Sequence, residues 1–274
     1  MSKESCVVKE HWIDVPQGRV YAVSWHPVEP VEVGLSPIVL FHDSLGCVAL
    51  WRDFPARLSQ ATGREVVAYD RLGFGRSDPF PGQLSLSFVS DEAKGTFAAL
   101  RKQLTLDRFV VFGHSVGGGM AAVTAGLYSD KCDALITEAA QAFVEDRTLA
   151  GILDARQAFS EANQLERLKR YHAEKAEWVL SAWIDTWLSE DFRAWSLDSM
   201  LPRVTCPTLA IHGEHDEYGS TRHPERIAGL TTGPAVTEIV EGCGHVPHRE
   251  NEDYVISAVK RFLGQTAFAQ LSAS

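Results

Sequence analysis

The sequence has no cluster of lysines and arginines, and its 26 Lys and Arg are outnumbered by 36 Asp and Glu, which gives a formal net charge of -10 at pH 7. Phosphate backbones and anionic membranes attract proteins that present a concentrated positive field. We therefore expect neither a nucleic acid nor a membrane among the partners of this chain.

A long hydrophobic run near the N-terminus is also missing. The stretch MSKESCVVKEHWIDV carries charges on both sides of its only short apolar pair. A secretory leader needs an apolar segment of about 7 to 15 residues, and a membrane-spanning helix needs about 20. We therefore expect no leader, no membrane span and a cytoplasmic location.

Cysteines are few and unpaired in pattern. The five of them, Cys6, Cys47, Cys132, Cys206 and Cys243, are odd in number, scattered, and form no CxxC pair. This pattern fits neither a disulfide framework nor a zinc knuckle. We expect reduced thiols that act as small apolar filler.

Glycine-rich phosphate-binding loops are absent as well. The segments GFGRSD and SVGGGM lack the lysine of a P-loop, and no G-x-G-x-x-G motif opens a helix after the first central strand. The sequence therefore predicts no nucleotide site, and we expect no cofactor.

What is present is an alternation of short apolar runs with longer amphipathic segments, in a chain with 45% hydrophobic and 23% charged residues. This order is typical of parallel strands joined by crossover helices, and it predicts an α/β fold. An antiparallel hairpin at 6–15 and 19–25 opens the chain. The expected central strands are 37–43, 65–70, 108–114, 133–139, 207–213 and 235–242. The expected helices lie near 49–60, 86–103, 222–230 and 251–264.

Residues 141–203 contain no strand-like run. They hold three helical patterns instead, at 147–160, 162–175 and 176–190, and no linker or internal repeat marks a second domain. An all-helical insertion in a βα series is most simply a cap over one edge of the sheet. We expect a core made of residues 1–140 and 204–274, with residues 141–203 as its helical cap.

The clearest motif is G-x-S-x-G at residues 113–117, directly after an apolar strand and before a helix of small residues. A serine on a tight strand-to-helix turn needs neighbours without Cβ, because the chain passes too close for larger side chains. The turn presents the hydroxyl at a helix N-terminus, where a developing anion is stabilised. Ser115 is therefore the candidate nucleophile.

A serine hydroxyl also needs a base, and the base needs an acid that orients it. Asp216 follows one late strand and His245 follows the next, so both should lie at the same sheet edge as Ser115. Glu138, at the end of a central strand, is a second candidate acid, and His248 is a second candidate base. His245 and His248 also form a weak His-x-x-His ligand pair, but without a third ligand we expect no metal.

Together these motifs resemble the capped α/β-hydrolase superfamily, in HDSLG at 42–46, YDRLGFGRSD at 69–78, GHSVGG at 113–118, and the pair GEHD and GCGHVPH. The resemblance covers nearly the whole chain. It implies a mostly parallel eight-stranded sheet with helices on both faces and a helical cap after strand 6. A serine at position 115 excludes the haloalkane dehalogenase and epoxide hydrolase branches, which would have aspartate there.

The resemblance also implies an oxyanion hole made of backbone N–H groups. One belongs to Val116, and the second belongs to Ser44 or, less in keeping with the pattern, to Asp43. Here the sequence departs from the family, which more often has His-Gly where this chain has His42-Asp43. An inward carboxylate would repel the oxyanion, whereas one that bonds to the loop would not, and the sequence leaves both arrangements open.

The function that follows is hydrolysis of a small or medium carboxylic ester, thioester or lactone through an acyl-enzyme. C–C bond hydrolysis of ring-fission products, cofactor-free perhydrolysis and non-catalytic ligand binding on the same fold stay open as alternatives. We expect a small-molecule substrate with an apolar acyl or aromatic part, and the sequence does not decide between a monomer and a homodimer. The expected pocket residues are Trp178, Trp183, Trp187 and Phe143.

Overall fold

The computed structural model describes residues 6–28, 34–160 and 162–271 of the 274-residue chain. Its core is one eight-stranded sheet in the order β1-β2-β4-β3-β5-β6-β7-β8. The first two strands form the expected hairpin, β2 pairs with β4 antiparallel, and the remaining pairs are parallel. The mostly parallel sheet is thus confirmed. Its strands are β1 Cys6–Val15, β2 Gly18–Pro27, β3 Ile38–Phe41, β4 Val66–Tyr69, β5 Phe109–His114, β6 Cys132–Glu138, β7 Thr208–Gly213 and β8 Ala235–Val240.

Every residue of β3, β4 and β5 is buried, because helices cover both faces of the sheet. Alternate residues of these strands belong to two separate apolar clusters. Val39, Val67 and Val111 pack against α2 (Phe88–Lys94), α3 (Thr96–Gln103) and α4 (Val116–Leu127). Ile38 and Val110 face α1 (Phe54–Thr62) and α10 (Glu252–Leu271) on the other side. The period of two along each strand therefore builds both halves of the core.

Two of the expected helices are divided. The segment expected at 49–60 begins as a short 3-10 turn, Val48–Trp51, and α1 starts only at Phe54, because Arg52 has a positive φ of 54° that a helix cannot continue. The segment expected at 86–103 is interrupted at Gly95, which ends α2 and precedes α3. The remaining helices of the core are α8 Arg222–Leu230 and the short α9 Pro247–Glu250.

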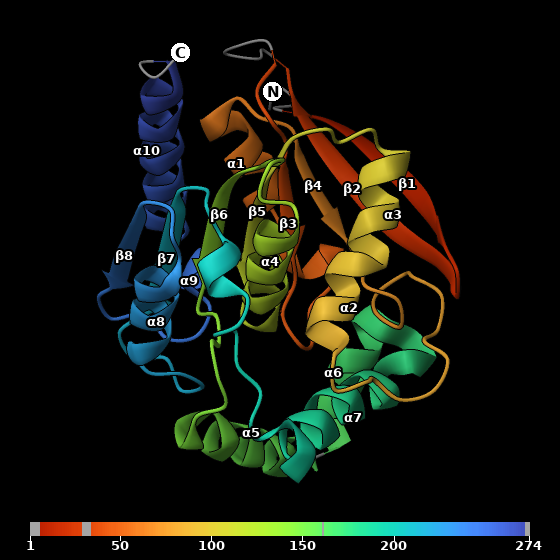
Figure 1. Ribbon diagram of the computed structural model, residues 1–274. Coiled ribbons are helices and arrows are strands. Elements are labelled where there is room, and N and C mark those ends of the chain that lie inside the picture. Colours follow the sequence, from red (N-terminus) through yellow and green to blue (C-terminus); the bar gives the residue numbers. More distant parts are fainter. Residues whose placement is uncertain (1–5, 29–33, 161, 272–274) are drawn as a thin grey trace.

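Among the described residues between β6 and β7 there are three α-helices: α5 Asp146–Phe159, α6 Ala162–His172 and α7 Ala176–Trp187. Figure 1 shows them together below the edge of the sheet at which the parallel strands end. The chain enters and leaves this segment side by side, because Phe143 pairs with Ser196 in an isolated β-bridge and Leu197 N–H donates to Ala142 O at 2.8 Å. Within the described residues, no helix combines the length and the apolar character that crossing a bilayer requires.

The turn from β5 into α4 is a tight contact of the core. Ser115 has φ 57°, a left-handed conformation that is strained for a residue with a side chain. A Cβ on Gly113 would lie 2.1 Å from the Gly117 carbonyl oxygen, and one on Gly117 would lie 2.2 Å from the Phe41 carbonyl oxygen. The two glycines therefore let the turn fold against β3.

We predict that Gly117→Ala lowers the free energy of unfolding by about 3 kcal/mol or more, because backbone atoms of β3 must move to admit the methyl group. Gly119→Ala, in the same helix, is the matched control: its Cβ meets nothing closer than 3.5 Å. The control should gain up to about 1 kcal/mol from the better helix propensity of alanine. Urea unfolding followed by circular dichroism measures both, and equal stability of the two variants would contradict the packing described here.

Candidate active site

Ser115 lies between the end of β5 and the start of α4, and its side chain opens into a cavity. Its backbone N–H donates to Glu138 O of the neighbouring strand β6 at 2.9 Å, which fixes the turn to the sheet. The hydroxyl therefore stands at the N-terminus of α4, where the helix dipole is positive.

His245 and Asp216 meet Ser115 from two loops that follow β8 and β7. The Nε2 atom of His245 lies 3.0 Å from Ser115 Oγ, and Nδ1 lies 2.9 Å from each carboxylate oxygen of Asp216. With the proton on Nδ1 donated to Asp216, Nε2 is left free to accept the serine proton. The structure thus brings together the three residues that the sequence singled out, in the geometry of an acid, a base and a hydroxyl.

The Asp216 carboxylate is buried but well satisfied. Besides His245, its Oδ1 accepts hydrogen bonds from the backbone N–H groups of Tyr218 at 2.7 Å and Gly219 at 3.2 Å. Burial alone would raise the pKa of Asp216, but the hydrogen bond and charge of His245 outweigh burial and lower it. Asp216 is therefore held as the anion that an orienting acid must be.

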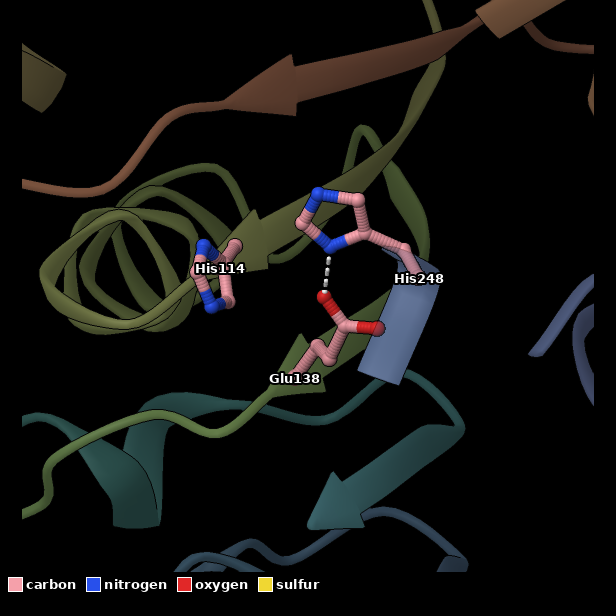
Figure 2. A group of neighbouring side chains, drawn as sticks. All are labelled: His114, Glu138 and His248. Atoms are coloured by element: carbon pink, nitrogen blue, oxygen red, sulfur yellow. Dashed lines mark hydrogen bonds and ion pairs between the residues drawn. The ribbon is translucent and has the colours of Figure 1, made fainter. Parts of the chain in front are cut away.

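The second candidate acid is engaged elsewhere. Figure 2 shows Glu138 pointing to His248, whose Nδ1 donates to Glu138 Oε2 at 2.5 Å, with His114 alongside. Burial would raise the pKa of Glu138, but the charges and hydrogen bonds of the neighbouring histidines lower it. The structure therefore does not bring Glu138 or His248 to Ser115, and the two form a buried hydrogen bond behind it.

His114 links this buried pair to the site. Its Nε2–H donates to the backbone carbonyl of His245 at 2.8 Å, and its Nδ1 lies 3.4 Å from Asp43 Oδ2. Burial lowers the pKa of His114, but the carboxylates of Asp43 and Glu138 outweigh burial and raise it. The residue directly before the serine thus holds the main chain that carries His245.

The same contacts show where the unusual Asp43 side chain lies. Its Oδ1 accepts a hydrogen bond from the Leu45 N–H at 2.8 Å, while its Oδ2 faces His114. Burial would raise the pKa of Asp43, but the neighbouring His114 lowers it well below the ordinary range. Of the two arrangements that the sequence left open, the carboxylate adopts the one in which it bonds to its own loop.

The three side chains behind Ser115 are also of types that can hold metal ions. His114, Glu138 and His248 offer ligand atoms that lie within 4.8 Å of one another. His114 Nε2 bonds to the His245 carbonyl and His248 Nδ1 bonds to Glu138, whereas His114 Nδ1 and Glu138 Oε1 have no hydrogen-bond partner among the described residues.

The cavity above Ser115 has a volume of about 210 Å³. Its apolar walls come from the loops after β3 and β8 and from the helical segment: Leu45, Leu50, Ile152, Trp183, Trp187 and Val246. Besides His114, Ser115 and His245, polar atoms are contributed by Asp43, Ser44, Gln141, Thr148, Tyr218 and Arg249. Among the expected pocket residues, Trp183 and Trp187 line the cavity.

The expectation for Trp178 and Phe143 is corrected by the structure, because neither lines this cavity. The Trp178 ring stacks on Phe80 at 5.3 Å and its Nε1–H donates to Gly82 O, so it packs the helical segment onto the loop after β4. The Phe143 ring instead lies 4.5 Å from the His223 ring at the base of the insertion.

Several cavity residues were not singled out from the sequence, Gln141 and Tyr218 among them. Gln141 comes three residues after the end of β6, and Tyr218 comes two residues after Asp216, with its ring 4.7 Å from that of His245. In the sequence, only their positions after strands could have pointed to them, because residues that follow parallel strands gather at the same edge of the sheet.

Comparison with known proteins places this geometry in a family. The family described as alpha/beta hydrolase fold matches residues 36–181. The 1-acylglycerol-3-phosphate O-acyltransferase ABHD5 of Rattus norvegicus is 33% identical over 115 residues, 42% of this chain and 32% of that protein. The chain thus spans about a third of the length of the first curated relatives that it matches. The serine hydrolase BPHL of Mus musculus is 26% identical over 223 residues, 77% of this chain and 74% of that protein.

Solved structures share the fold at low identity. Proline iminopeptidase of Mycobacterium smegmatis is 20% identical, with a TM-score of 0.71 over 96% of this chain and 100% of that chain. Because the family match covers more than half of the 274 residues and the eight-stranded sheet agrees with it, the chain belongs to the alpha/beta hydrolase fold family.

Proposed function

We propose that this protein is a serine hydrolase that cleaves small or medium carboxylic esters through an acyl-enzyme. The observation that carries the proposal is the continuous line of hydrogen bonds from Asp216 through His245 to Ser115 Oγ, at 2.9 and 3.0 Å. A hydroxyl paired in this way to an oriented imidazole, at the floor of a cavity, is suited to attack a carbonyl carbon.

In the first half of the reaction the Ser115 Oγ–C bond forms while the serine proton moves to His245 Nε2. The tetrahedral intermediate collapses when the bond to the leaving oxygen breaks, and that oxygen takes the proton from Nε2. Water then repeats the sequence: it gives a proton to Nε2, adds to the acyl carbon, and the Ser115 oxygen leaves with that proton. Asp216 stabilises the imidazolium that forms twice per turnover.

The oxyanion is assigned to the backbone N–H groups of Val116 and Ser44. Val116 is the first residue of α4, so its N–H is among those that a helix leaves without an intrahelical acceptor. Ser44 lines the cavity next to Ser115. The Asp43 carboxylate, held by Leu45 N–H and His114, does not compete for this position.

The substrate class rests on the cavity. Six apolar side chains line it, and its volume of about 210 Å³ suits a small or medium acyl group. Two of the relatives, an O-acyltransferase and a serine hydrolase, carry names that fit acyl chemistry. The helices of residues 141–203 act as a cap on the core formed by 1–140 and 204–274, because Trp183 and Trp187 of α7 form part of the cavity wall.

Ser115→Ala should lower kcat for p-nitrophenyl esters by at least about a thousandfold, because the nucleophile is lost while the cavity is kept. Hydrolysis of the acetate, butyrate, hexanoate and octanoate esters, followed by absorbance, measures the loss and gives the preferred acyl length. Equal rates for wild type and variant on all four esters would refute the serine mechanism.

Replacing each of the two buried acids, Asp216 and Glu138, by its amide shows which of them orients His245. Asp216→Asn should lower kcat by about a thousandfold or more, because the amide no longer orients and charges His245. Glu138→Gln should change kcat less than about tenfold but lower the free energy of unfolding by about 1 to 3 kcal/mol, since it weakens the buried bond to His248. Steady-state kinetics and urea unfolding of both variants measure these effects. A large loss of kcat in Glu138→Gln and a small one in Asp216→Asn would make Glu138 the orienting acid.

Trp183→Ala should shift the preferred acyl length to longer chains, because the ring forms part of the cavity wall. Trp178→Ala is the control: it removes a tryptophan of the same helix that lies outside the cavity, and it should leave the preferred length unchanged. The ester series given above measures both variants, and an unchanged optimum in Trp183→Ala would rule out this wall as the acyl site.

A further inference from the structure

One polar side chain of the cavity has no part in the proposed mechanism. Gln141 is 3% exposed, follows β6, and places its Oε1 3.3 Å from Ser115 Oγ. The cavity walls around it are mainly apolar. A buried amide lowers stability unless its hydrogen bonds are made, so what Gln141 bonds to decides its role.

Those bonds are incomplete when the site is poised to react. Ser115 has a single hydroxyl proton, and the mechanism needs that proton on the line to His245 Nε2 at 3.0 Å. Within the part of the chain that the structure describes, Gln141 Oε1 then receives no hydrogen bond, and Nε2 is left with a contact to Ala139 O at 3.5 Å, at the outer limit of a hydrogen bond. The amide therefore offers both an acceptor and a donor to a bound molecule.

The order of the strands in the sheet indicates which part of a bound ester lies beside Gln141. Strand β5, which carries Ser115, has β3 on one side and β6 on the other. Ser44 follows β3 and takes the carbonyl oxygen, whereas His245 must reach the leaving oxygen to protonate it. The third substituent of the reacting carbon, the acyl chain, is left for the β6 side, where Gln141 lies.

We propose that Gln141 is a specificity-determining residue that selects acyl groups with a hydroxyl on the carbon next to the scissile carbonyl. The substrate class is then esters of 2-hydroxy acids, and this assignment rests on the proposed ester hydrolysis at Ser115. The substrate hydroxyl donates to Oε1 and accepts from Nε2, which completes both bonds of the amide. A neutral partner fits because the two charged side chains at this cavity that lie outside the proposed mechanism are already engaged: Asp43 faces His114, and Arg249 donates to Leu50 O.

The test compares ethyl lactate, ethyl propanoate and ethyl alaninate, which differ only in the substituent on that carbon. Each kcat/KM, measured by pH-stat titration, is divided by the ester's hydroxide rate constant to remove intrinsic reactivity. Wild type should prefer lactate over propanoate by about tenfold or more, as expected for one hydrogen-bond pair inside an apolar pocket. Gln141→Met, which keeps the length but not the polar atoms, should abolish the preference, because the normalised kcat/KM for lactate then falls at least about tenfold more than that for propanoate.

The outcomes separate this inference from the proposed function. Hydrolysis that needs Ser115 but shows no lactate preference in wild type, or the same preference in Gln141→Met, overturns the role of Gln141 and leaves the hydrolase intact. A preference for alaninate over lactate overturns 2-hydroxy acid esters as the substrate class, because Gln141 would then select an ammonium group on that carbon. Rates that are the same in Ser115→Ala for all three esters overturn both. The wild-type comparison needs no variant, so the inference stays testable even if Gln141→Met does not fold.

Discussion

The close approach of the Ser115 turn to strand β3 is the constraint on which the site depends. With only hydrogen at positions 113 and 117, the start of α4 lies directly against Gly113 of β5 and against the carbonyl of Phe41, and Ser115 adopts φ 57°. That strain is maintained by the surrounding core, because β3, β4 and β5 are buried on both faces. The hydroxyl therefore stands where loops from β7 and β8 can reach it.

Behind this turn lies a row of paired and hydrogen-bonded side chains. Asp43 faces His114, and Glu138 pairs with His248, while the His114 ring donates to the main chain of His245. Buried polar side chains are tolerated when they are hydrogen-bonded. These contacts join the loop after β3 to the main chain of His245, and the strand β6 to the helix α9.

The sequence was sufficient for features that depend on local pattern. Continuous apolar runs placed the central strands within a few residues, and the motif at 113–117 located the strained turn. Distances across the sheet could not be predicted in this way. Trp178 and Trp183 stand five residues apart on α7 with similar surroundings in sequence, yet only Trp183 lines the cavity, because helix rotation decides which ring faces Ser115. Likewise, only the fold shows that Glu138 meets His248 and that Gln141 meets Ser115.

The central claim is that Ser115 is a nucleophile activated by His245. Intact-protein mass spectrometry after treatment with a fluorophosphonate, followed by peptide mapping, tests it without knowledge of the natural substrate. The account predicts addition of one phosphonyl group, located on Ser115, and at least a hundredfold slower labelling in His245→Gln. Absence of labelling in the folded wild type, or a label on another residue, would contradict it.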